Sequence, residues 1–192
     1  MSLEDKSLIL RAQAGDKRAF AELMRRYGER VMNQALRFTR NIKDAEDLYQ
    51  ETFLKVYRNL GGFRFESEFY TWVYRIMANI AFSQYRRKKR FSYLESEEDS
   101  TPWDRVTAQN GCPENPIKEE EGRRLKDAIY AALSKLSAQQ RIVFIMKHYE
   151  GKKIREIAEL LECSEGTVKR YLFRAVKKLQ SLLKPYYEES LV

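Results

Sequence analysis

The sequence has few of the residues that build most catalytic and metal-binding sites. Its 192 residues include two cysteines, Cys112 and Cys163, and a single histidine, His148. The cysteines lack the spacing of a zinc site, and two of them cannot make a disulfide framework. A phosphate-binding glycine loop, a dinucleotide-binding turn and a paired-histidine motif are also absent. We therefore expect a protein that is not an enzyme and that holds no metal or cofactor.

Long apolar runs and loop-forming residues are scarce as well. Charged residues interrupt the first 16 positions before any apolar stretch reaches the length of a signal peptide, and nothing approaches the roughly 20 apolar residues of a membrane span. The chain has 8 glycines and 4 prolines, and three of the prolines fall within residues 91–117. We expect a largely helical protein of the reduced cytoplasm, with one or two small domains.

Lys and Arg outnumber Asp and Glu, and the distribution of these charges divides the chain into three parts. Residues 1–90 carry 19 Lys and Arg against 11 Asp and Glu, and residues 123–192 carry 15 against 8. Between them, residues 91–122 carry 2 basic and 9 acidic residues. The two basic blocks predict a polyanionic partner, whereas the acidic bridge would be repelled by DNA.

Apolar residues recur with helical spacing through both basic blocks, with few strand-like alternations. One helix is predicted to follow Gly15 and Asp16 and to break near Asn41. Asp44 is predicted to cap the next, which would stop at Gly61 and Gly62.

A long helix is then predicted over residues 70–90, and shorter ones beyond residue 128. The sequence thus predicts an all-α protein with two small helical domains, at residues 1–94 and 121–192, joined by an acidic flexible linker at residues 95–120.

Residues 154–182 are typical of two helices joined by a tight polar turn, with Ser164 placed to cap the second helix. At roughly 100° per residue, one side of the second helix is apolar and the opposite side is basic and aromatic. The outward residues are Lys169, Arg170, Phe173, Arg174 and Lys177. Such a face suits a DNA major groove, because Arg pairs with guanine, a ring touches the thymine methyl and Lys neutralises phosphate. A solvated face on a helical hairpin is the alternative.

Residues 63–90 are unusually aromatic and end in a basic run at residues 86–90. Rings interleaved with cations favour single-stranded nucleic acid, because unstacked bases lie on rings while cations hold the backbone. Aromatic residues at helical spacing are equally typical of a core, and this alternative is strongest for Trp72 and Tyr74. It is weaker for the loop at residues 64–68.

Three segments in order, residues 44–60, residues 63–90 and the C-terminal helical pair, resemble the extracytoplasmic-function sigma factors of bacterial RNA polymerase, in the sigma-70 superfamily. The resemblance covers about residues 8–183, the acidic bridge excepted. It implies a promoter-specificity subunit whose N-terminal domain, region 2, binds core polymerase and reads and melts the minus 10 element. The C-terminal domain, region 4, would read the minus 35 element, and an anti-sigma factor is an expected partner.

The resemblance also implies roles for individual residues. The core-polymerase contact would be made by Asp47, Gln50, Glu51 and Leu54. The minus 10 site would comprise the base-capture loop and two helical residues: Arg64, Phe65, Glu66, Ser67, Glu68, Trp72 and Asn79. The minus 35 contacts would be Lys169, Arg170, Phe173 and Arg174, with Lys177 added by its place on the basic face. Many relatives have glycine where Phe65 stands, so its ring is expected to reshape the pocket.

Two other functions fit parts of the sequence. A stand-alone helix-turn-helix regulator would bind palindromic duplex DNA without polymerase. An RNA-binding adaptor would bind single-stranded RNA through its first 95 residues. A sigma factor, in contrast, would bind DNA weakly until core polymerase is added.

Overall fold

A computed structural model describes residues 2–91 and 127–188, with side chains placed for residues 2–83 and 127–184. The predicted linker and the side chains of the basic run at residues 86–90 lie outside this part. The first helices are α1 (Leu3–Gln13), α2 (Lys17–Thr39), α3 (Ile42–Asn59), a 3-10 turn η1 (Leu60–Gly62) and α4 (Phe69–Phe91). A helix at residues 127–134 follows, then α6 (Ala138–Phe144), a π-helical turn η2 (Ile145–Tyr149), α7 (Ile154–Leu160) and α8 (Glu165–Glu188).

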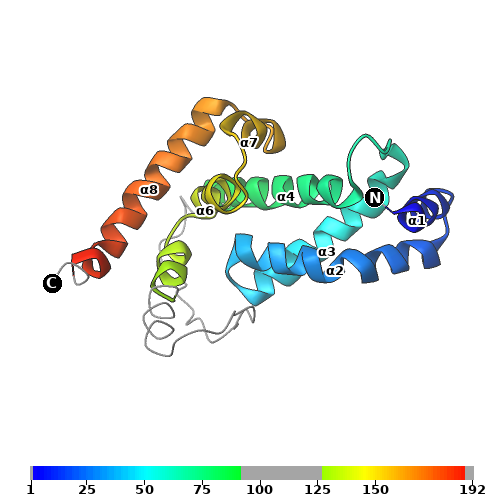
Figure 1. Cartoon of the computed structure of the whole chain (residues 1–192), viewed down its shortest axis with the longest axis horizontal. Coiled ribbons are helices and arrows are strands. Elements are labelled where there is room, and N and C mark those ends of the chain that lie inside the picture. Colours follow the sequence, from blue (N-terminus) through cyan, green and yellow to red (C-terminus); the bar gives the residue numbers. More distant parts are fainter. Residues whose placement is uncertain (1, 92–126, 189–192) are drawn as a thin grey trace.

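The all-α prediction is confirmed, since these two ranges contain helices and no strand. Four helices, α1 to α4, form an N-terminal bundle, with α1 across one end (Figure 1). Its core is built from the apolar stripe of each helix, and the deepest side chains, such as Leu23, Phe38 and Met77, are fully buried. No described helix is long and apolar enough to cross a bilayer.

Local polar residues set the helix starts. The Asp16 carboxylate accepts hydrogen bonds from the backbone N–H groups of Arg18 and Ala19 at 2.9 and 3.1 Å, which caps α2. The prediction that Asp44 caps the next helix is wrong. Asn41 is the cap and accepts from the Asp44 backbone N–H at 3.1 Å, so α3 begins earlier, at Ile42.

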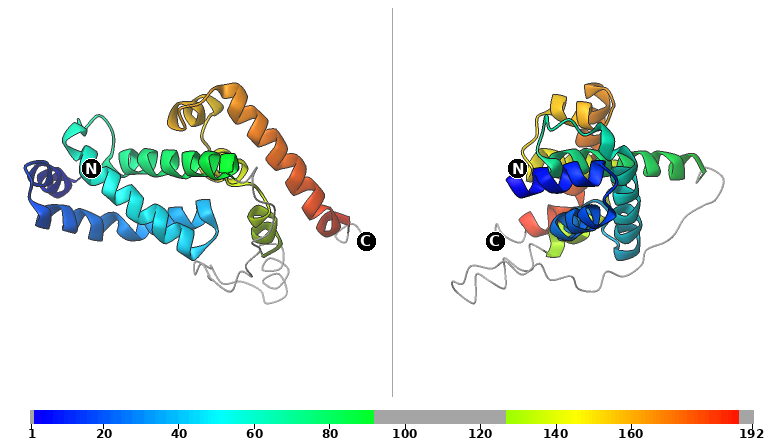
Figure 2. Two further views of the ribbon diagram at one scale, coloured as in Figure 1. Left: turned by 180° about the vertical axis from the view of Figure 1, so that it is seen from behind. Right: turned by 90° about the vertical axis from the view of Figure 1, so that its right-hand side faces the viewer.

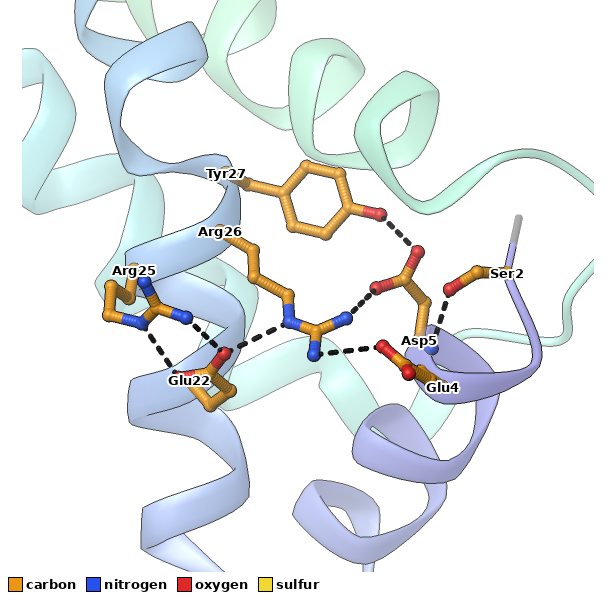
Figure 3. A network of polar contacts seen from close by, with 7 residues as sticks. All are labelled: Ser2, Glu4, Asp5, Glu22, Arg25, Arg26 and Tyr27. Carbon is orange, nitrogen blue, oxygen red and sulfur yellow. Dashed lines mark hydrogen bonds and ion pairs between the residues drawn. The ribbon is translucent and has the colours of Figure 1, made fainter.

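A polar network fixes α1 on α2 (Figure 3). The Arg26 guanidinium contacts Glu22 at 3.0 Å and reaches across to Glu4 and Asp5 at 3.2 Å. The hydroxyl of Tyr27 donates to Asp5 at 3.1 Å. Hydrogen bonds from Arg25 and Arg26 lower the pKa of Glu22 to about 2. The network matters for the site because α1 also holds the loop that precedes α4.

The C-terminal helices form a second body that packs against the first. Residues 127–136 pack against the later part of α8 through Leu133, Leu136, Leu179 and Leu183. The main core, in contrast, continues from α1 through α6 and α7 to Val168 at the start of α8. Figure 2 shows α6 at the end of α4, with α8 running away from the bundle.

Arg141 of α6 contacts both bodies. It is a buried charged residue, 6% exposed. It donates to three backbone carbonyls of its own body and to two at the end of α2. The acceptors are Leu133, Ser134, Leu136, Phe38 and Thr39, at 2.6–3.2 Å. A charged group in the core is thus matched by carbonyl oxygens, including two that end a helix.

Candidate nucleic-acid interface

The outward face predicted for the second helix of the hairpin is present on α8. Five side chains are exposed along it: Lys169, Arg170, Phe173, Arg174 and Lys177. Phe173 is 69% exposed, which is unusual for a large apolar ring and leaves it open to a partner. The opposite face is apolar, with Val168 and Ala175 fully buried.

The turn between α7 and α8 sets the direction of this face. Ser164 caps α8, as predicted, by accepting from the Thr167 backbone N–H at 3.2 Å. Glu162 takes the left-handed conformation with φ 49°, and Cys163 packs partly buried against the core. α7 is held by the fully buried Ile157. The cap and the buried α7 therefore fix the start of α8 and leave its basic face exposed, with Lys169 3.5 Å from the Glu165 carboxylate.

The predicted base-capture loop at residues 64–68 lies between η1 and α4. Gln13 of α1 holds the base of the loop, since its amide donates to the carbonyls of Leu60 and Phe63 at 2.9 and 3.0 Å. Arg64, Glu66, Ser67 and Glu68 are exposed. The loop is therefore a short solvent-facing segment on a fixed base, which is the usual arrangement of a binding loop.

Phe65 differs from the other loop residues. Its φ is 60°, in the left-handed region, where glycine is comfortable and a bulky residue is strained by about 1–2 kcal/mol. Its ring is half-buried and lies 5.0 Å from the ring of Phe63, centroid to centroid. The ring closes the loop onto the core and does not stand free as a stacking platform.

The helical members of the predicted minus 10 site lie on α4. Trp72 is half-buried and packs 5.1 Å from the Phe63 ring. Tyr74, which is not one of the predicted minus 10 residues, is a core residue, 6% exposed. The amide of Asn79 donates to the Glu162 carboxylate at 3.2 Å, so it is hydrogen-bonded to a side chain of the C-terminal body.

The predicted core-polymerase contact lies on the outer side of α3. Asp47, Gln50 and Leu54 are exposed, Leu54 by 56%, and Glu51 is half-exposed. Tyr57, 44% exposed, extends the same side and packs edge-on against Phe20 at 4.9 Å. An acidic row beside two exposed apolar side chains is the composition expected of a protein contact.

A groove that the sequence analysis missed runs between α2 and α4, with a volume of about 580 Å³. Its lining from α2 includes three arginines and Glu29, its lining from α4 is mostly tyrosine, and the segment after η2 closes one side. The principal members are Arg30, Gln34, Arg37, Tyr70, Tyr74, Glu150 and Lys152. The signal in the sequence was the helical spacing of Arg26, Arg30, Asn33 and Arg37 opposite the apolar stripe of α2.

One carboxylate of the C-terminal body sits in this groove. Glu150 accepts from the Tyr74 hydroxyl at 2.7 Å and from the Gln34 amide at 2.8 Å. Lys152 lies 5.3 Å from the centroid of the Tyr74 ring. Burial, and then the Glu150 charge, raise the pKa of Tyr74, so its hydroxyl stays protonated and remains a donor. Glu150 and Glu162 thus contact α4 from the same body.

Comparison with known proteins places these features in one family. The model of sigma-70 region 2 matches residues 23–91, and that of sigma-70 region 4 matches residues 126–179. The RNA polymerase sigma-H factor of Pseudomonas aeruginosa is 32% identical over 97% of both chains. The ECF RNA polymerase sigma-E factor of Haemophilus influenzae is 32% identical over 95% of this chain and 97% of the relative.

Solved structures agree with this. The sigma factor RpoE of Bartonella quintana, solved with the anti-sigma factor NepR, has a TM-score of 0.59 and 26% identity over 86% of this chain and 96% of that chain. CnrH, in complex with the cytosolic domain of CnrY, has a TM-score of 0.51 and 25% identity over 95% of this chain and 98% of that chain. With both regions matched and relatives similar over nearly its whole length, the chain belongs to the sigma-70 family of RNA polymerase sigma factors, in the extracytoplasmic-function (ECF) group.

Proposed function

We propose that this sigma factor directs initiation by binding core RNA polymerase through α3, reading the minus 35 element with α8 and capturing the opened minus 10 strand at the loop before α4. The observation that carries the DNA-reading role is the exposed basic and aromatic face of α8, with Phe173 at 69% exposure. A helix with exposed Arg, Lys and an apolar ring at its N-terminal half fits a major groove.

The division of labour follows the domain limits predicted above, residues 1–94, 95–120 and 121–192. The protein would act in the cytoplasm, with promoter DNA and the polymerase. An anti-sigma factor is a further proposed partner, because the relative from Bartonella quintana was solved with one. The identity of the relatives as sigma factors argues against a stand-alone regulator.

Reconstituted transcription tests the proposal. Core polymerase plus the full-length protein should start RNA at defined promoters selected from a fragment library, and neither component alone should do so. Tight binding of the free protein to palindromic duplex DNA, with no polymerase-dependent initiation, would instead identify a stand-alone regulator.

The α3 contact gives a prediction of its own. Replacing Asp47 and Glu51 together with lysine should weaken core association by at least about tenfold, because the change reverses the potential of an interface while exposed charges add little to stability. Pull-down with core polymerase measures the loss.

The matched control is Lys55→Glu with Arg58→Glu, which changes as many charges on exposed residues of the same helix but increases its acidity. Circular dichroism should show that both doubles fold. Unchanged retention of the folded Asp47 and Glu51 variant on core polymerase would remove this side of α3 from the interface.

A further inference from the structure

The loop at residues 64–68 follows a turn that has little rigidity of its own. This turn, η1, contains Gly61 and Gly62, which are both exposed, and a methyl group added to either would meet nothing within 4 Å. Glycine gives the backbone its widest choice of conformations. The backbone N–H of Phe63 donates to the Leu60 carbonyl at 3.0 Å and closes the turn. A turn with two glycines needs a further constraint if the loop after it is to keep one shape.

That constraint comes from α1. Gln13 is the last residue of α1, and its amide nitrogen lies 2.9 Å from the Leu60 carbonyl oxygen and 3.0 Å from that of Phe63. A side-chain amide nitrogen carries two N–H donors, so it can give one to each carbonyl. The two acceptors lie at the two ends of the turn. Gln13 therefore holds the turn closed from outside, across 47 and 50 positions of sequence.

Gln13 is itself a fixed point, because α1 is held at both ends. Ile9 is fully buried, and the ion pair between Arg11 and Asp16, at 2.6 Å, spans the turn from α1 to α2. The network around Arg26 holds the beginning of α1 (Figure 3). The loop is thus connected through Gln13 to the most firmly packed part of the bundle.

The residue that Gln13 holds also supports the aromatic side chains of the site. Phe63 is 4% exposed, and its ring lies 5.0 Å from that of Phe65, 5.6 Å from Phe69 and 5.1 Å from Trp72, centroid to centroid. A left-handed backbone such as that of Phe65 persists only where its surroundings over-determine it. A shift of Phe63 would therefore move both Phe65 and Trp72, which belong to the proposed minus 10 site.

We propose that Gln13 is a positioning residue for minus 10 recognition. By holding the turn, it keeps the loop at residues 64–68 in one shape, and a pocket of one shape can reject bases that do not fit. A loop released from Gln13 would adapt to several bases, because flexible binding surfaces re-pack around different partners. The inference rests on the proposed function, since it gives Gln13 a part in base capture by this loop.

Two variants of Gln13 test the proposal in holoenzyme. Gln13→Glu has nearly the same shape but turns acceptors toward two carbonyl oxygens, whereas Gln13→Met removes the donors and adds no charge. Promoter opening is followed by permanganate reactivity on templates with single-base changes in the minus 10 element. The preference for the best base should fall on the order of tenfold for Gln13→Glu and about threefold for Gln13→Met. Preference at the minus 35 element and core affinity should not change.

A second measurement uses the free full-length protein. Hydrogen exchange of the backbone amides, followed by mass spectrometry, should be at least about fivefold faster at residues 60–69 in Gln13→Met, because the turn opens locally. Exchange within α2 and α3 should match wild type. This pattern separates release of the loop from a general loss of stability.

The turn also offers a rescue. Gly61→Ala with Gly62→Ala should stiffen it through the backbone, because both positions have room for a methyl group and neither has a positive φ. Added to Gln13→Met, the pair should restore most of the lost preference at the minus 10 element. Arg11→Met is the matched control, since Arg11 lies on the same helix and pairs with Asp16. It should keep the wild-type preference.

Wild-type minus 10 preference in a folded Gln13→Glu holoenzyme would overturn the inference. An equal loss at the minus 10 and minus 35 elements, or the same loss in Arg11→Met, would also overturn it, because Gln13 would then be a general support of the fold. The proposed function fails differently: exchanging residues 64–68 for the loop of another ECF sigma factor would leave the minus 10 preference unchanged. A preference that moves with the loop but not with Gln13 rejects the inference alone.

Discussion

Replacing Arg141 with methionine should lower the free energy of unfolding by about 3 kcal/mol, a large loss for a single substitution. Arg141 is 6% exposed, and its guanidinium donates to five backbone carbonyls. Methionine retains much of the apolar stem but leaves those buried acceptors unsatisfied. Urea denaturation followed by circular dichroism measures the difference.

Two controls accompany this variant. Arg155→Met removes an arginine whose side chain is 81% exposed and pairs with Glu159, and it should leave the urea midpoint of unfolding unchanged. Arg141→Lys keeps the charge but cannot reach five acceptors with one ammonium group, so it should lose most of the same stability. If Arg141→Met lowers the free energy of unfolding by less than about 1 kcal/mol, water donates to the five carbonyls in place of the guanidinium.

The largest expected effect on function concerns Arg174. Arg174→Ala should reduce discrimination at one base pair of the minus 35 element by about 1–3 kcal/mol, because in the proposed role Arg174 makes a bidentate contact to guanine that alanine cannot make. Lys177→Ala should instead weaken all promoter variants by a similar factor and reduce the salt slope by about 1, as expected for a phosphate contact.

Holoenzyme footprints on a panel of single-base minus 35 variants separate these two behaviours. Both residues are exposed on the same face of α8, so neither substitution should disturb folding. If both variants lose affinity equally on every promoter, Arg174 contacts the backbone and another residue reads the base.

Local patterns made much of this fold predictable. The apolar and basic sides of α8 follow from its helical period alone, and the structure exposes all five residues expected to face outward. The cap of α3 was misjudged because Asn41 and Asp44 are both good capping residues, three positions apart. In the structure Asn41 caps, and Asp44 donates its backbone N–H to it.

The site was harder to predict because two of its features depend on more than local sequence. Phe65 was expected to reshape the base-capture pocket, but its sequence did not show how; in the structure its backbone is left-handed and its ring packs on Phe63. The contact between Gln34 and Glu150 joins residues 116 positions apart. The helical periodicity of the sequence does not show which surface of one body packs on the other. The groove, its buried donors and the Glu150 carboxylate that accepts from them are therefore identified only in the structure.

The shared surface between the two bodies has a thermodynamic consequence. Glu150 meets Tyr74 and Glu162 meets Asn79, so both acceptors belong to the C-terminal body and both donors to α4. Separating the bodies releases both donors in one step. By linkage, when two ligands both bind the separated form more tightly, each raises the affinity for the other by the same factor. If a captured strand and the polymerase both bind the separated form, each would therefore tighten the binding of the other by the same factor.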